Sequence, residues 1–213
     1  MNTPSLAPIR IADFIAAFSQ SPLAPWAELA PWQLSARSTD LVRELLSALD
    51  GPSWRIAGDI ALHDTAVVEA GAVLKGPLIV GARSFIAAGA YLRGGCWLDA
   101  DCIIGPGAEL KSSFVFAGSK LAHFNFVGDS VLGADVNLEG GSIVCNYRNE
   151  RTDKRIRVRI GAELHQLDTP KFGALIGDHS RIGANAVLAP GALLTPGSVI
   201  ARTALRDDEL SPS

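Results

Sequence analysis

The sequence lacks any apolar run that approaches the roughly 20 residues a helix needs to span a bilayer. Its first ten residues also lack the basic segment followed by an apolar segment that marks a secretory signal. We therefore expect no membrane segment, no signal peptide and a cytoplasmic protein.

Cysteine and histidine are scarce, with three and four in 213 residues. Cys96, Cys102 and Cys145 show no C-x-x-C spacing, and their odd number argues against a disulfide framework. The histidines form no close pair in the sequence, whereas a metal site needs clustered ligands. We therefore expect reduced thiols and no bound metal.

Charge is also sparse, because Asp, Glu, Lys and Arg make up only 19% of the chain and the formal net charge is −3. This balance gives no sign of a nucleic-acid partner or of an anionic membrane. The hydrophobic share of 48% excludes a disordered chain. The 21 glycines and 12 prolines indicate frequent turns.

The prominent feature is a repeat of six residues. Every sixth position from Leu62 to Phe116 is large and apolar, and the series resumes at Leu132 and again at Ile176. A helix cannot keep this period against its own 3.6 residues per turn, and a single strand is never so long. The repeat predicts an all-β solenoid, a left-handed parallel β-helix with three six-residue sides per coil and coils about 4.8 Å apart.

Segments without the repeat suggest the domain organisation. Residues 1–55 have helical apolar spacing and are expected to cap the open end of the solenoid, with docking to a partner as the alternative. The β-helix is expected over 56–205, with an irregular coil at 117–131 and an insertion at 146–173. Residues 206–213 are expected to be a frayed tail.

The insertion is strongly basic. The tract from Arg155 to Ile160 alternates strictly between basic and apolar residues and predicts a strand with one basic face. Either a solvated hairpin or a surface for phosphate or a partner protein fits this pattern. The acidic total of the chain disfavours nucleic acid. The cations in question are Arg148, Arg151, Lys154, Arg155, Arg157 and Arg159.

A column of cations is predicted on one side of the solenoid. Lys75, Arg93 and Lys111 each follow an inward aliphatic residue and are 18 residues apart, which is one full coil. Like charges about 4.8 Å apart repel, so such a column is expected where an anion binds. The alternative is three solvated side chains that spread into water.

His123 lies in the stretch where the repeat breaks. Its ordinary pKa near 6.5 suits a general base, although a lone histidine is more often a surface residue. Asn137 precedes an inward leucine, where a role in turn geometry is the simpler explanation.

Residues from about 58 to 194 resemble the left-handed β-helix domain of bifunctional sugar-1-phosphate nucleotidylyltransferase/glucosamine-1-phosphate acetyltransferases. The nucleotidylyltransferase domain of that family has no counterpart in this sequence. The matching segments are Tyr91 to Arg93, Glu109 to Lys111, Ala122 to Asp129, Val136 to Leu138, Ile143 to Tyr147 and Lys171 to Asp178.

The resemblance implies roles for individual residues. His123 would be the general base that takes a proton from the attacking sugar amine, and acetyl-CoA would be the acyl donor. The family forms parallel homotrimers with sites between subunits. The implied binding residues are Arg93 and Lys111 for the sugar phosphate, Asn137, Asn146 and Tyr147 for the acceptor sugar or the histidine, and Lys171 for the acyl donor.

Departures from the family pattern leave two functions open. Phe126 stands where the acetyltransferase has a tyrosine, Ala184 stands where a donor-contacting serine would be, and Glu139 brings a carboxylate near the acceptor. The first function is an acyltransferase acting on an amino-sugar phosphate or a nucleotide sugar. The alternative is a non-catalytic trimer that binds sugar nucleotides or serves as a regulatory scaffold for a separate nucleotidylyltransferase.

Overall fold

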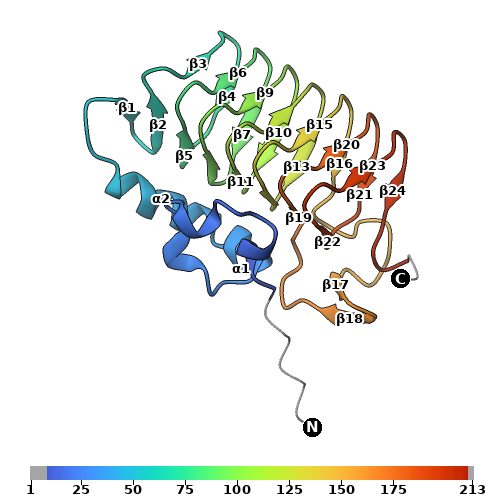
Figure 1. Cartoon of the computed structure of the whole chain (residues 1–213). Coiled ribbons are helices and arrows are strands. Elements are labelled where there is room, and N and C mark those ends of the chain that lie inside the picture. Colours follow the sequence, from blue (N-terminus) through green and yellow to red (C-terminus); the bar gives the residue numbers. More distant parts are fainter. Residues whose placement is uncertain (1–8, 211–213) are drawn as a thin grey trace.

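A computed structural model describes residues 9–210. The chain forms a left-handed parallel β-helix with a helical segment packed along one side (Figure 1). The predicted fold class is therefore confirmed. None of the helices in the described part is long and apolar enough to cross a membrane.

Three sheets make the sides of the solenoid. Sheet A contains β1 (Trp54–Ala57), β2 (Ile60–His63), β5 (Leu78–Val80), β8 (Cys96–Leu98), β11 (Phe114–Val115), β14 (Val131–Leu132), β19 (Ala174–Ile176) and β22 (Ala192–Leu194). Sheet B contains β3 (Val67–Val68), β6 (Phe85–Ile86), β9 (Ile103–Ile104), β12 (Lys120–Leu121), β15 (Asn137–Leu138), β20 (Arg181–Ile182) and β23 (Val199–Ile200). Sheet C contains β4 (Val73–Leu74), β7 (Tyr91–Arg93), β10 (Glu109–Lys111), β13 (Phe126–Gly128), β16 (Ile143–Val144), β21 (Val187–Leu188) and β24 (Leu205–Arg206).

The repeat builds the core as expected. One aliphatic residue per side points inward and lies beside its equivalent in the next coil, as Leu62 pairs with Val80 and Val80 with Leu98. These positions are almost all fully buried and form one continuous cluster along the solenoid axis.

The expected irregular coil at 117–131 is wrong. Val115, not Phe116, is the inward residue, because it pairs with Leu98 on one side and Leu132 on the other. Two sides of the solenoid have five residues instead of six, Leu110 to Val115 and Val127 to Leu132. The coil that carries His123 is therefore regular, with β12 and β13 in register with their neighbours.

The N-terminal helices cover sheet A and do not cap the open end, which corrects the expectation for residues 1–55 (Figure 1). Their apolar side chains pack on the outer face of sheet A, where Trp97, Phe114 and Phe116 stand. Residues 1–8 lie outside the described part. The helices are η1 (Ile11–Asp13), η2 (Phe18–Gln20), η3 (Ala24–Trp26), α1 (Pro31–Ala36) and α2 (Ser38–Ala48).

The first coil is protected by β1. This strand runs antiparallel to β2 and covers its free edge, with Trp54 paired to His63. Unpaired edges invite association with other strands, so this short hairpin does the capping that was expected of the helices.

The insertion is a hairpin of β17 (Arg157–Ile160) and β18 (Glu163–Gln166), as the alternation predicts. The apolar residues Ile156 and Val158 are fully buried among the side chains that join the helices to sheet A. The hairpin therefore extends the cover of sheet A.

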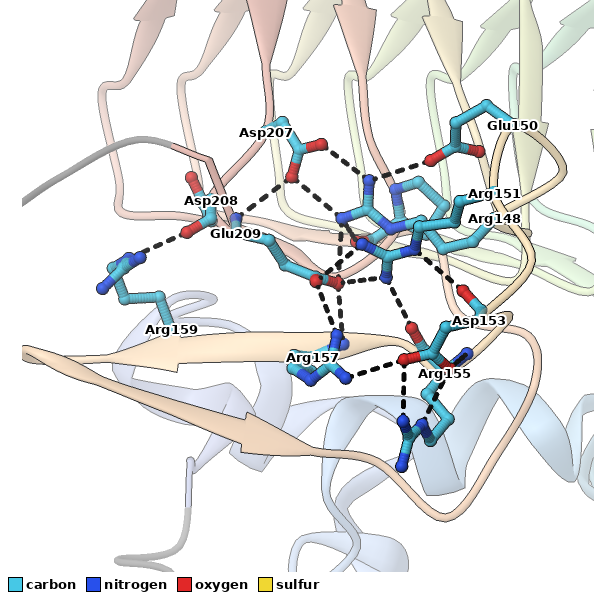
Figure 2. Close-up of polar contacts among 11 residues, drawn as sticks. Arg148, Glu150, Arg151, Asp153, Arg155, Arg157, Arg159, Asp207, Asp208 and Glu209 are labelled. Carbon is cyan, nitrogen blue, oxygen red and sulfur yellow. Dashed lines mark hydrogen bonds and ion pairs between the residues drawn. The ribbon is translucent and has the colours of Figure 1, made fainter.

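The basic face of the hairpin is neutralised by the C-terminal tail (Figure 2). Glu209 lies within ion-pair distance of Arg148, Arg151 and Arg157. Asp207 is also buried, so the tail is ordered through position 210 and not frayed as expected. The insertion thus offers neither the solvated hairpin nor the open phosphate surface that the sequence suggested.

Candidate functional site

A hollow of about 620 Å³ lies at the corner between sheets B and C. We call it the His123 corner and define it by residues 122–124, 137, 139–141 and 184–185. Three successive coils supply it, because β12, β15 and β20 are neighbours in sheet B and the chain leaves each of them at this corner.

His123 is exposed and stands at this corner immediately after β12. Its backbone carbonyl accepts the Gly141 N–H at 2.9 Å, which fixes the backbone of the turn to the next coil. The imidazole tip lies over Gly140. A methyl group at that glycine would come within 2.8 Å of Cδ2 and Cε1, and nearer still to Nε2. Among the described residues, no side chain bonds the ring nitrogens, so they are available to a ligand.

The next residue, Phe124, is conformationally unusual. Its φ is +52°, in the left-handed region, and its side chain is 68% exposed. The equivalent positions one coil before and one coil after are Gly107 and Gly141, which adopt this region without a Cβ penalty. The Phe124 ring lies against Gly107 and meets His123 edge-on at 5.8 Å between ring centroids. At the same position two and three coils on, Asn185 and Thr203 are also left-handed, so the conformation belongs to this turn and the large side chain is what distinguishes Phe124.

Glu139 brings a negative charge to the same corner. Its carboxylate accepts the Ala184 N–H at 2.8 Å and two hydrogen bonds from Arg202, each also 2.8 Å. The hydrogen bond from the Arg202 guanidinium, followed by that from the Ala184 amide, lowers the pKa of Glu139 below its ordinary value. This carboxylate is therefore ionised at neutral pH.

The predicted cation column lies at the opposite edge of sheet C, where the chain passes to sheet A. Lys111 pairs with Arg93 in the strand register, as their spacing predicts. Two of the three cations have counter-ions: Arg93 Nη2 lies 2.6 Å from Glu109, and Lys111 Nζ lies 2.7 Å from Asp129. Lys75 Nζ lies instead 5.2 Å from the centroid of the Tyr91 ring. Arg93 and Lys111 therefore do not carry the unbalanced charge that was expected of the column.

Asn146 belongs to this second group, which we call the cation corner and define as Arg93, Glu109, Lys111, Asp129 and Asn146. The Asn146 side-chain amide donates to Asp129, the carboxylate that also binds Lys111. Phe126 lies on sheet C between the two corners, with the tip of its ring near Gly128.

The remaining predicted residues have separate positions. Asn137 lines the hollow beside His123. Tyr147 lies apart, next to a hollow of about 380 Å³ near Cys145, with Lys154 Nζ 5.4 Å from its ring centroid. Lys171 is exposed, and the amide after it, at Phe172, donates to the Asn146 carbonyl near the cation corner.

Sequence reasoning missed the counter-ions of the cations and the residues that share an edge of the solenoid with His123. Glu109 lies two residues before Lys111 on the same strand, and a strand places such residues on one face. That spacing was visible. Gly140 and Arg202 carried no comparable signal, because their positions relative to His123 depend on coils of 17 residues and on the insertion. Within residues 9–210, no group of three or more His, Cys, Asp and Glu is placed to hold a metal ion.

Comparison with known proteins finds similarity to bifunctional nucleotidylyltransferase/acetyltransferase proteins. It is 36% identical over 105 residues to a bifunctional sugar-1-phosphate nucleotidylyltransferase/acetyltransferase of Sulfurisphaera tokodaii, covering 46% of this chain and 26% of that protein. It is 31% identical over 192 residues to the bifunctional protein GlmU of Methanococcus maripaludis strain C7, covering 87% of this chain and 45% of that protein. The chain is a relative of these bifunctional proteins.

The relationship has a limited span. The chain covers less than half the length of these relatives. No protein-family model matches it. Among solved structures, the acetyltransferase domain of PglB from Neisseria gonorrhoeae, in complex with acetyl coenzyme A, is 15% identical, with 83% of this chain and 71% of that chain covered at a TM-score of 0.30.

Proposed function

We propose that the protein is an acyltransferase that moves an acetyl group from acetyl-CoA to the amine of an amino-sugar phosphate or a nucleotide sugar. The observation that carries the proposal is the exposed imidazole of His123 at the 620 Å³ hollow, held above a glycine, with none of the side chains in residues 9–210 bonded to its nitrogens. One relative is named a bifunctional sugar-1-phosphate nucleotidylyltransferase/acetyltransferase, which supports the choice of acceptor.

His123 serves as the general base in this reaction. The amine nitrogen attacks the thioester carbonyl while the imidazole takes its proton, and the C–S bond then breaks to release CoA. The same imidazolium can return its proton to the departing thiolate, so the enzyme ends in its starting state. A positioned base contributes about 10²–10⁴-fold to such a step.

The cation corner supplies the phosphate site in this proposal. An acceptor lying along sheet C, with its amine at His123, directs its phosphate toward Arg93 and Lys111. Because Glu109 and Asp129 already pair with these cations, a phosphate binds by displacing or sharing those carboxylates. Asn137, Asn146, Tyr147 and Lys171 remain predictions for acceptor and donor contacts.

A homotrimer is part of the proposal. Within residues 9–210, helices and the hairpin cover sheet A, whereas no element covers sheets B and C. These bare faces expose Val67, Val73, Val199 and Leu205, which association of identical chains would bury. Sedimentation analysis of the purified chain tests this part.

The activity is tested by measuring thiol release from acetyl-CoA with glucosamine 1-phosphate and related amino sugars. The variant His123→Ala should lose about 10²–10⁴-fold in rate. His179→Asn is the matched control, because His179 is also exposed at a turn with left-handed φ, a conformation that asparagine tolerates. Equal rates for His123→Ala and the native chain would exclude the mechanism.

The second candidate is a sugar-nucleotide-binding or scaffold trimer without catalysis. It is favoured by the ion pairs that already hold Arg93 and Lys111. It is also favoured by the Glu139 carboxylate, which accepts the hydrogen bond of the Ala184 N–H in the hollow. Calorimetry separates the two: binding of UDP-sugars without binding of CoA supports the scaffold.

A further inference from the structure

Four residues form a column along the edge that contains the His123 corner. Leu121, Leu138, Ile182 and Ile200 are in register across sheet B. The residues two positions after each of these are His123, Gly140, Ala184 and Arg202. The column therefore begins with an imidazole, continues with the two smallest side chains and ends with a guanidinium.

The small residues Gly140 and Ala184 line the hollow at His123, and we call the edge from His123 to Arg202 the groove. Asn137 and Glu139 line both this hollow and a second hollow of about 400 Å³. Arg202 lines the second hollow. Three coil steps separate His123 from Arg202, which corresponds to about 14 Å at the usual strand spacing.

Arg202 is held in a way that a ligand can replace. Its Nε and Nη2 atoms both donate to the Glu139 carboxylate, and its side chain is 73% exposed. Exposed ion pairs contribute at most about 1 kcal/mol, so breaking this pair costs little. A guanidinium that binds a carboxylate with two parallel bonds presents the geometry that also fits a phosphate.

We propose that Arg202 is the phosphate-binding residue for the acyl donor and that Glu139 occupies it, as a carboxylate stand-in, until the donor binds. The ligand class is a thioester that carries a phosphate at the far end of an extended arm, as on a phosphopantetheine. The inference rests on the proposed function, since it takes the groove from His123 as the donor site.

Glu139 acts against the donor in two ways. It competes with the phosphate for Arg202, and its charge stays in the groove after Arg202 leaves, because the Ala184 N–H still holds it. The Glu139–Arg202 pair therefore sets the affinity for the donor without taking part in proton transfer.

The test measures CoA binding by calorimetry to the full chain and to Glu139→Gln and Arg202→Met. Glutamine keeps the acceptor for the Ala184 N–H but removes the charge, so CoA should bind several-fold more tightly. Methionine keeps the stem of Arg202 without the guanidinium, so CoA should bind about tenfold more weakly, the scale of one charge-assisted hydrogen bond. In the double variant the gain from Glu139→Gln should disappear.

Two controls fix the interpretation. Pantetheine, which lacks the phosphate, should bind the native chain and Arg202→Met equally. Arg83 and Asp101 form a similar exposed two-bond pair on earlier coils, at 2.7 and 2.6 Å, and Asp101→Asn should leave CoA binding unchanged. Thermal unfolding midpoints check that each variant is folded.

Each outcome decides the inference. CoA binding to Glu139→Gln but not to the native chain supports it. Unchanged affinity in both single variants overturns it, as does a failure of the native chain and of Glu139→Gln alike to bind CoA. If affinities shift as expected but no acceptor is acetylated, the proposed function falls and the inference stands. If acetyl transfer occurs while both affinities stay unchanged, the inference falls and the proposed function stands.

Discussion

Arg148 donates to both carboxylate oxygens of Asp207, at 2.7 and 2.9 Å, across 59 residues of sequence, and both side chains are buried (Figure 2). A further hydrogen bond from Arg148 reaches the Pro190 carbonyl at 3.1 Å. This pair ties the start of the insertion to the end of the solenoid. Through Ile156 and Val158, the same insertion packs against the cover of sheet A.

Asp207→Ala should destabilise the protein strongly. Removing one partner of a buried pair costs about 3–5 kcal/mol when the other charge is left without compensation. Glu209, 3.1 Å from Arg148, should keep the loss toward the lower end of that range. Urea unfolding followed by circular dichroism measures the loss. Glu150→Gln is the matched control, because Glu150 contacts the same guanidinium at 3.4 Å but is 60% exposed, and it should change stability little. Similar losses for both variants would show that burial of Asp207 is not what matters.

The stability that Asp207 and Glu209 give to the fold should be lost at acid pH. Burial opposes ionisation of Asp207 and Glu209, but the hydrogen bonds and charges of Arg148 and Arg151 outweigh it and lower the pKa of both. A lowered pKa in the folded state adds stability that is complete above the ordinary carboxyl value near 4 and is lost as the pH falls through the folded value.

The unfolding midpoint in urea should therefore drop between about pH 5 and pH 3, within the range set by ordinary carboxyl values. In Asp207→Asn, which cannot titrate, the drop should be shallower, although the midpoint at pH 7 is lower from the outset. A drop of equal size in that variant would assign the pH dependence to other carboxyls.

Phe124→Gly should stabilise the fold while it weakens the site. A left-handed residue with a Cβ costs about 1–2 kcal/mol, and glycine avoids this cost. The ring is mostly exposed, so its removal loses little burial. Thermal unfolding should show a higher midpoint, with Phe124→Asn similar and Phe124→Val lower. The rate of acetyl transfer should fall, because His123 loses the ring that it packs against.

The fold could be predicted from the repeat because each inward residue is apolar and each coil repeats the same contacts. The prediction failed at Phe116 for a physical reason. A side of five residues moves the inward position back by one, from Phe116 to Val115, and both residues are large and apolar. Hydrophobicity alone could not distinguish the core of the solenoid from the face beneath the helices.

The candidate site was less predictable than the fold. The 18-residue spacing placed Lys111 beside Arg93, because both lie on unbroken coils. The separation of the cation corner from His123 by the width of sheet C was not foreseen. Nor was the pairing of Glu139 with Arg202, 63 residues later, because the insertion lies between them. Contacts that cross irregular segments leave no periodic trace in a sequence.

Gly140→Ala should reduce catalysis by displacing His123 with little loss of stability. The φ of Gly140 is not in the left-handed region, so alanine fits the backbone, and the three atoms nearest to a new Cβ all belong to the imidazole. The ring must rotate away from a new methyl group 2.8 Å from Cδ2 and Cε1, which moves Nε2 from its place in the hollow. We expect a fall in kcat of about 10²-fold with little change in KM, the signature of a misplaced base. In the His123→Ala background the same substitution should have no further effect, because there is no ring to displace. A fall of the same size in that background would mean that Gly140 acts on the substrate directly.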